Sequence, residues 1–86
     1  MERYLRRATT QDIKLLFKWA NDSETRKNSF NTNPISWEEH QAWFARKIAD
    51  DKSEIYIFMD FFVPVGMVRL DFEDEHTAVI SYSIAA

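Results

Sequence analysis

The spacing of apolar residues changes once along this chain of 86 residues, near residue 53, and the change constrains the fold class. Before it, apolar side chains recur every three or four residues, which is the period of an α-helix. After it, β-branched and aromatic residues alternate with other residues, which is the period of a β-strand. Helices followed by strands predict an α+β fold, with helices packed on an antiparallel sheet.

Two helices are predicted in the first half, and each begins with a capping box. In this motif an N-cap side chain and an acid three residues later bond to backbone N–H groups that the helix leaves unpaired. Thr9 and Asp12 open the first helix, whereas Ser36 and Glu39 open the second, which runs to about Asp50. The first helix carries an apolar stripe at helical spacing: Ile13, Leu16, Phe17 and Ala20.

The strands complete the order β-α-α-β-β-β. A short strand is predicted at residues 4–8, before the first helix. The three later strands are predicted at Glu54–Met59, Val65–Phe72 and Thr77–Ile84. Because no linker or repeat interrupts the pattern, we expect one domain over residues 1–86, with a sheet of three or four strands and two packed helices.

The connections carry two unusual segments. Residues 21–35 are polar and turn-rich, with a short helical turn expected around Glu24 to Lys27. Within them, residues 26–30 combine donors, acceptors and an aromatic ring, so they form either a functional loop or a turn whose side chains bond the local backbone. The turn after the second strand contains Phe61, Phe62 and Val63, although hairpin turns favour Asn, Asp and Gly. Either this apolar tip contacts another chain or segment, or one Phe packs under the sheet.

Composition excludes several kinds of site. The chain holds one glycine, Gly66, and loops that cradle phosphates need several, so no glycine-rich phosphate loop lies within these residues. Cysteine is absent, which removes disulfides and thiolate ligands and fits a reducing, cytoplasmic setting. A net charge of −3 disfavours nucleic-acid binding. No apolar run approaches the length of a membrane span or a signal peptide, so no membrane association is expected.

No catalytic or metal-binding group is identified from the residues alone. His40 and His76 lie in different predicted elements, so no metal site is expected, and His40 is predicted to be a surface or half-buried residue. The acidic turn of residues 73–76 is typical of a solvated hairpin tip. Ser81 and Ser83 have no recognisable His-Asp partners for nucleophilic catalysis.

Several segments of the chain form one larger pattern. They are Leu5-Arg-Arg-Ala-Thr9, Asp12, Leu16-Phe-Lys-Trp-Ala-Asn-Asp22, Arg26-Lys-Asn-Ser-Phe30, Ile35-Ser-Trp-Glu-Glu-His40, Trp43-Phe44, Val65-Gly66 with Arg69, and Ile80-Ser-Tyr-Ser-Ile84. Together these segments resemble the N-terminal half of the GNAT superfamily of acetyl-CoA-dependent N-acetyltransferases. The similarity covers essentially the whole chain and is closest to the branch that acetylates amino sugars on nucleotide carriers, as in pseudaminic acid biosynthesis.

The resemblance implies acetyl transfer from acetyl-CoA to a small-molecule amine, that of an amino sugar. In the family, the fourth strand offers backbone groups to the pantetheine arm of the coenzyme, which places cofactor binding at Tyr82, Ser83 and Ile84. The loop between the first two helices lines the acceptor pocket, which places substrate binding at Asn28, Ser29 and Phe30. The family's glycine-rich pyrophosphate loop follows that fourth strand, so we expect weak or absent acetyl-CoA binding and no activity from these residues alone.

The competing interpretation is a non-catalytic interaction module. The strand Thr77–Ile84 would lie at an open sheet edge, able to pair with a second copy of the chain or with another protein. A homodimer through this edge is the partner that this interpretation predicts. Whether the chain acts as an enzyme therefore stays open at the level of sequence.

Overall fold

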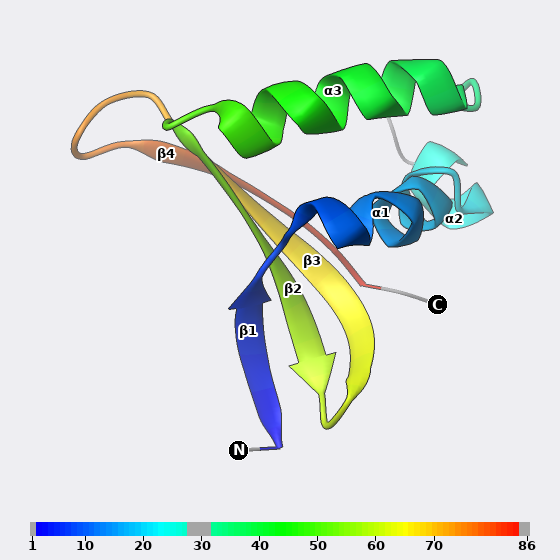
Figure 1. Ribbon diagram of the computed structural model, residues 1–86, viewed down its shortest axis with the longest axis horizontal. Coiled ribbons are helices and arrows are strands. Elements are labelled where there is room, and N and C mark those ends of the chain that lie inside the picture. The colour runs from blue at the N-terminus through cyan, green and yellow to red at the C-terminus, as the bar shows by residue number, and fades with distance from the viewer. Residues whose placement is uncertain (1, 28–31, 85–86) are drawn as a thin grey trace.

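The computed structural model describes residues 2–27 and 32–84, and for Ser23 and Glu24 the backbone alone. The elements in chain order are β1 (Arg3–Arg7), η1 (Thr10–Asp12, one turn of 3-10 helix), α1 (Ile13–Ala20), α2 (Ser23–Lys27), α3 (Trp37–Ala49), β2 (Ser53–Asp60), β3 (Val63–Phe72) and β4 (Ala78–Ile84). Figure 1 shows them as helices packed beside one twisted sheet. The predicted α+β class and element order are confirmed, and the expected helical turn between the two main helices is α2.

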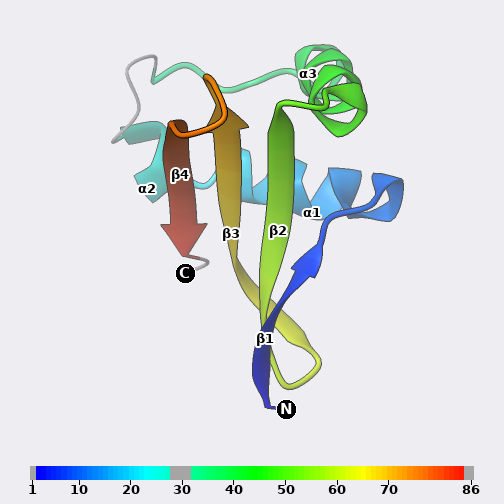
Figure 2. The ribbon, with the colours of Figure 1, turned by 90° about the vertical axis from the view of Figure 1, so that its left-hand side faces the viewer.

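The sheet has four antiparallel strands in the order β1-β2-β3-β4. Each strand therefore pairs with its neighbour in sequence, while β1 and β4 form the two edges. Figure 2 looks onto the sheet with α1 and α2 behind it. Because side chains alternate between the two faces of a strand, the helices cover one set of side chains and leave the other set on the opposite face.

The core lies between β2 and the helices. Every second residue of β2 is buried, beginning with Ser53 and continuing through Ile55, Ile57 and Met59. The three apolar side chains among them pack with Leu16 of α1 and with Ala8 and Phe44. Full burial of a large aliphatic side chain contributes about 1.5–3 kcal/mol, so this small cluster supplies much of the stability of the domain.

The capping box at the first helix is confirmed in both halves. Thr9 accepts from the N–H of Gln11 through its hydroxyl, and the Asp12 carboxylate accepts from the N–H of Thr9 at 2.8 Å. Arg6 of β1 donates two hydrogen bonds of 2.8 Å to the same carboxylate. These bonds hold the pKa of Asp12 below its ordinary value and raise that of Arg6, because each charge stabilises the other. The bidentate pair thus joins β1 to the start of the helix.

The turn between β2 and β3 is shorter than predicted. It contains Phe61 and Phe62 alone, because Val63 pairs with Asp60 and Pro64 pairs with Met59. A shift in register between Phe58 and Met59 brings Val63 and Pro64 into β3. Pro64 has no backbone N–H to donate, but β4 pairs with β3 only from Gly66 onward. Pro64 therefore interrupts no hydrogen bond between β3 and β4. Phe61 has a φ of 57°, which suits a tight turn.

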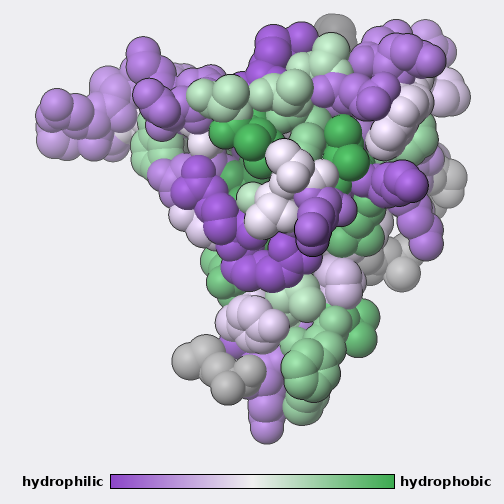
Figure 3. Space-filling view, viewed as in Figure 1, coloured by the Kyte–Doolittle hydropathy of each residue, from purple (hydrophilic) through white to green (hydrophobic). Residues whose placement is uncertain are grey.

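The apolar tip is exposed. Phe61 is 56% exposed and Phe62 is 90% exposed, so the interpretation in which one Phe packs under the sheet is wrong. The hairpin projects away from the helices at the lower end of the molecule, where hydrophobic residues reach the surface (Figures 1 and 3).

His40 lies in the core, which corrects the prediction of a surface or half-buried residue. Its side chain is 2% exposed, and its Nε2 lies 2.8 Å from the carbonyl oxygen of Ile13, so it links α3 to α1. Its ring stacks against Trp43 and Phe44. Among the described residues, no group of three or more His, Asp or Glu side chains could hold a metal ion. In the same part of the chain, no helix has the length and apolar character needed to cross a bilayer.

Candidate functional site

A cavity of about 480 Å³ lies where α1, α2 and α3 meet the β3–β4 edge of the sheet. Residues from all five elements and from the segment before α3 line it: Leu16, Trp19, Ala20, Thr25, Arg26, Ile35, Glu39, His40, Trp43, Met67, Arg69, Ser81, Tyr82 and Ser83. A cavity with an apolar wall and a few charged groups is the usual form of a small-molecule site. It is therefore the candidate functional site of this chain.

The apolar wall comes mainly from the helices. Trp19 of α1 and Trp43 of α3 contribute large rings, and Met67 of β3 faces them from the sheet. The stacking of His40 on Trp43, with ring centres 5.8 Å apart, holds the Trp43 ring at the cavity. Because His40 is itself bonded to the backbone of Ile13, this wall is fixed by packing between two helices.

The charged groups are Arg26, Glu39 and Arg69. Arg69 is held by three contacts. Its Nε donates to the Asp71 carboxylate at 2.8 Å, and its Nη2 donates to the hydroxyl of Ser81 at 3.4 Å. Its guanidinium carbon lies 5.4 Å from the centre of the Trp43 ring, a distance that permits a cation–π contact. The position of Arg69 is therefore set by β3, β4 and α3 together.

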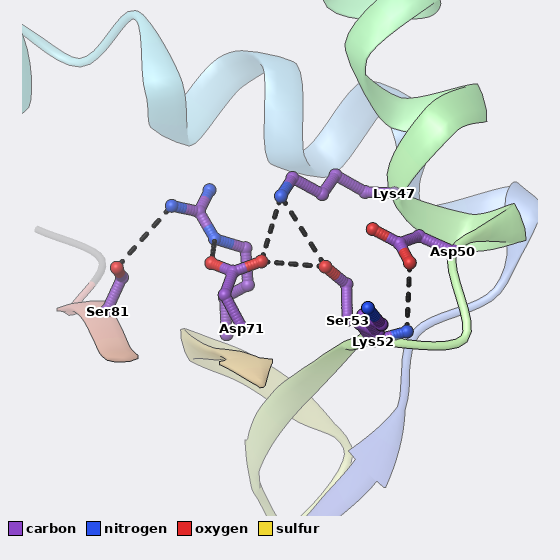
Figure 4. A network of polar contacts seen from close by, with 7 residues as sticks. Lys47, Asp50, Lys52, Ser53, Asp71 and Ser81 are labelled. Atoms are coloured by element: carbon purple, nitrogen blue, oxygen red, sulfur yellow. Dashed lines mark hydrogen bonds and ion pairs between the residues drawn. The ribbon is translucent and has the colours of Figure 1, made fainter. Parts of the chain in front are cut away.

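Asp71 is the centre of this polar network (Figure 4). Lys47 of α3 donates to it at 2.8 Å, and Ser53 of β2 donates at 2.7 Å. These hydrogen bonds, with the nearby charge of Arg69, lower the pKa of Asp71 to about 2, because they stabilise the ionised carboxylate. The carboxylate thus stays negative at neutral pH and ties α3 to the central strands.

The structure brings only some of the predicted site residues to this cavity. Tyr82 and Ser83 line it, whereas Ile84 follows them in β4 and does not belong to the lining residues. Asn28, Ser29 and Phe30 lie outside the described residues. The described residues nearest to them in sequence that line the cavity are Arg26 and Ile35. The predicted acceptor segment lies between these two lining residues in the sequence.

Sequence reasoning did not single out Trp19, Glu39, Trp43 or Arg69 as site residues. The signal for Arg69 was its place on a strand face with Met67 and Asp71, opposite a fully apolar face. Alternation alone does not say which face the helices cover. The structure decides this point, because Arg69 pairs in register with buried Ile55 and with Ser81.

A second cavity, of about 440 Å³, lies beside the β3–β4 turn. It is lined in part by Glu73, Asp74 and Glu75, which are exposed. Backbone bonds between residues 73 and 77 close this turn, since the N–H of Glu73 donates to the carbonyl of Thr77 at 2.9 Å. The prediction of a solvated tip at residues 73–76 is confirmed by this exposure.

The comparisons with known proteins identify the fold. No protein-family model matches the chain, and no curated protein sequence matches it. Among solved structures, spermidine N-acetyltransferase from Vibrio cholerae in complex with CoA and spermine is 18% identical, with a TM-score of 0.80, over 98% of this chain and 52% of that one. AAC(6')-Ib in complex with paromomycin and acetyl-CoA is 19% identical, with a TM-score of 0.78, over 100% of this chain and 55% of that one.

A domain from Methanocaldococcus jannaschii is similar to the same degree, with 22% identity and a TM-score of 0.78. It matches over 95% of this chain and 55% of its own length. The chain thus spans about half the length of the solved structures that it matches. At these identities the similarity establishes the fold, which is the one that N-acetyltransferases share; the narrower resemblance to the pseudaminic acid branch receives no support from the comparisons.

Proposed function

We propose that this chain is the acceptor-binding part of an acetyl-CoA-dependent N-acetyltransferase and that its acceptor is the amine of an amino sugar. We further propose that these residues alone bind the coenzyme weakly and do not catalyse acetyl transfer. One observation carries the proposal. The cavity adjoins Tyr82 and Ser83 of β4, the strand assigned to the pantetheine arm, in a fold whose solved examples include complexes with CoA and acetyl-CoA.

The reaction joins the acceptor nitrogen to the acetyl carbonyl carbon. The new C–N bond forms as the C–S bond breaks, and the sulfur of CoA leaves as a thiolate that takes up a proton. The acceptor ammonium must lose a proton before its nitrogen can attack. Glu39 is an exposed residue that lines the cavity, and its carboxylate would hold the ammonium there.

The edge position of β4 supplies the coenzyme contacts. β4 pairs only with β3, so the backbone groups on its outer side have no strand partner within the sheet. Such groups can bond to the amides of pantetheine as a further strand would. The pyrophosphate has no glycine-rich cradle within these 86 residues, whose one glycine is in β3. Coenzyme binding by these residues is therefore expected to depend on the pantetheine arm.

The test compares two ligands by the backbone amide signals of the ¹⁵N-labelled chain. We expect pantetheine and acetyl-CoA to shift the same signals of β4, at residues 82–84, with similar weak affinity. An acetyl-CoA affinity far above that of pantetheine would show that these residues bind the pyrophosphate, which would contradict the weak-binding part of the proposal. Unchanged β4 signals with both ligands would contradict the coenzyme site itself.

A thiol-release assay with acetyl-CoA and glucosamine tests turnover in the same sample. We expect the rate with glucosamine to equal the rate of uncatalysed hydrolysis. Acetylated glucosamine formed faster than this would confirm the transferase chemistry and would contradict the expectation that these residues do not turn over alone.

The exposed edge of β4 favours one other function, a module that associates through strand pairing. Ile80 and Tyr82 are 64% and 75% exposed beside that edge. Sedimentation velocity over a concentration series tests this candidate, with Ile80→Lys as the disrupting variant and Leu5→Lys on the opposite edge strand as its control. Association that Ile80→Lys abolishes and Leu5→Lys preserves would support it, whereas a monomer at every concentration would contradict it.

A further inference from the structure

Arg69 presents unused donors to the cavity. Its Nε bonds to Asp71 and its Nη2 to Ser81, while its Nη1 has no hydrogen-bond partner among the described residues. The side chain is 25% exposed and lines the cavity. A guanidinium carries five N–H donors in a planar fork, and the edge that bears Nη1 and Nη2 can bind two oxygens of one anion.

The local charges leave a surplus of one positive charge at this place. Lys47 and Arg69 both pair with the single carboxylate of Asp71. One oxygen of that carboxylate accepts from Lys47 and Ser53, and the other accepts from Arg69. A partly buried positive charge that is not fully neutralised by the protein favours an anionic ligand.

The guanidinium is also fixed before any ligand binds. Asp71 holds its Nε, and the Trp43 ring lies against its face. Little side-chain entropy is then lost on binding, so the donors act as a preformed site. A surface arginine without these contacts would lose more freedom and bind an anion more weakly.

We propose that Arg69 is a specificity-determining residue that binds an oxyanion, a phosphate or a carboxylate, on the acceptor. The inference rests on the proposed function, since it concerns the acceptor of that reaction. The acceptor then carries a negative group for Arg69 and an amine for Glu39. Polycations such as spermine, which the similar Vibrio cholerae structure contains, are poor ligands here because Arg69 repels them.

The test measures the affinity of the chain for four compounds by calorimetry: glucosamine, glucosamine 6-phosphate, glucosaminic acid and spermidine. We expect at least one of the two acidic sugars to bind about tenfold or more tightly than glucosamine, since hydrogen bonds to charged groups are the stronger class. The two acidic sugars separate phosphate from carboxylate recognition. Equal affinities, tighter binding of spermidine, or no measurable binding of either acidic sugar at millimolar concentration would overturn the proposal.

A matched pair of variants assigns the preference to Arg69. Arg69→Gln should bring the affinity for the preferred acidic sugar to that of glucosamine. Arg46→Gln, which removes the same charge from an exposed position on α3 away from the cavity, should keep the preference. A preference that survives in Arg69→Gln overturns the proposal.

A measurement on the unaltered chain covers the case in which Arg69→Gln fails to fold. The acidic sugar should shift the Arg69 Nε–H signal, and glucosamine at equal saturation should not. Equal shifts, or no shift with either compound, overturn the proposal. The proposed function is judged separately. If acetyl-CoA shifts the β4 signals and no oxyanion preference is found, only this inference is overturned. If an oxyanion preference is found and neither coenzyme ligand shifts the β4 signals, the transferase function is overturned, and anion binding at Arg69 stands without the acceptor role.

Discussion

Single polar side chains under α3 decide how the helix meets the sheet. The one carboxylate of Asp71 accepts hydrogen bonds from three elements: from Lys47 of α3, Ser53 of β2 and Arg69 of β3. Its pKa of about 2 lies below the ordinary value of an aspartate, so folding favours the ionised form. The ionised Asp71 therefore stabilises the fold fully at pH values above the pKa of about 4 that an aspartate has in the unfolded chain. This stabilisation is lost as the pH falls from about 4 toward 2.

Asp71→Asn should therefore reduce the acid sensitivity of the fold. At pH 7 the variant should lose at most about 2 kcal/mol of unfolding free energy, because the carboxylate's charge interactions are gone. Between pH 4 and pH 2 it should lose less further stability than the unaltered chain does. Urea unfolding across this range measures both effects. Asp51→Asn, at an exposed turn, is the control; an acid-dependent loss in Asp71→Asn equal to that of the control would contradict the assignment.

At the scale of elements, the single glycine lies where β3 has no room for a side chain facing β4. A Cβ atom at Gly66 would lie 2.7 Å from the carbonyl oxygen of Ser83 and 3.4 Å from Cδ1 of Ile84. The first distance is shorter than any normal contact with a backbone atom. Gly66 therefore sets the position of the β4 segment to which coenzyme contacts are assigned.

Gly66→Ala should displace β4 at Ser83. We expect a loss of about 1–3 kcal/mol in unfolding free energy, as for other overpacked sites, and shifted amide signals at residues 83 and 84. The control is Val79→Ala, at a half-exposed position of β4, which should lower the unfolding free energy by about 0.5 kcal/mol or less. Urea unfolding and amide spectra measure these effects. A Gly66→Ala variant as stable as the control would contradict the close approach.

At the scale of the whole molecule, the helices cover one face of the sheet and the stability is unevenly distributed. Ile57 at the centre of β2 is fully buried, whereas Ile80, Tyr82 and Ile84 of β4 are each more than half exposed on the uncovered face. Strands with few buried contacts open more often than central ones. The part of the chain assigned to coenzyme binding thus lies in an edge strand that is less protected than the central strand β2.

Hydrogen exchange should follow this gradient. We expect amides of β2 that bond to β3 to exchange most slowly and those of β4 to exchange faster, because β4 lies at an edge and buries little apolar area. Exchange at several protein concentrations, followed by NMR, measures the order. If the protection of β4 amides rises with protein concentration, fast exchange is not a property of β4 in the monomer as expected here. That result would indicate association of chains through the β4 edge.

The sequence predicted most of the elements because local signals define them. Alternation in residues 54–59 was sufficient to predict β2, and the capping box at Thr9 was sufficient to predict the start of the first helical segment. Both predictions are confirmed. His40 was misplaced, although it lies three residues after Trp37 and four before Phe44 and so shares their helix face. The bulge that brings Pro64 into β3 left no local signal, since it depends on pairing with β2.

By itself, then, the sequence determined the α+β class, the element order and the absence of a glycine-rich loop, because periodicity, caps and composition act over a few neighbouring residues. Only the tertiary structure decided which strand face the helices cover, and hence that Arg69, Trp43 and Ser83 share one cavity. These residues are far apart in the chain and meet through strand register and helix packing. Contacts of that kind depend on the pairing of whole elements, which no local pattern records.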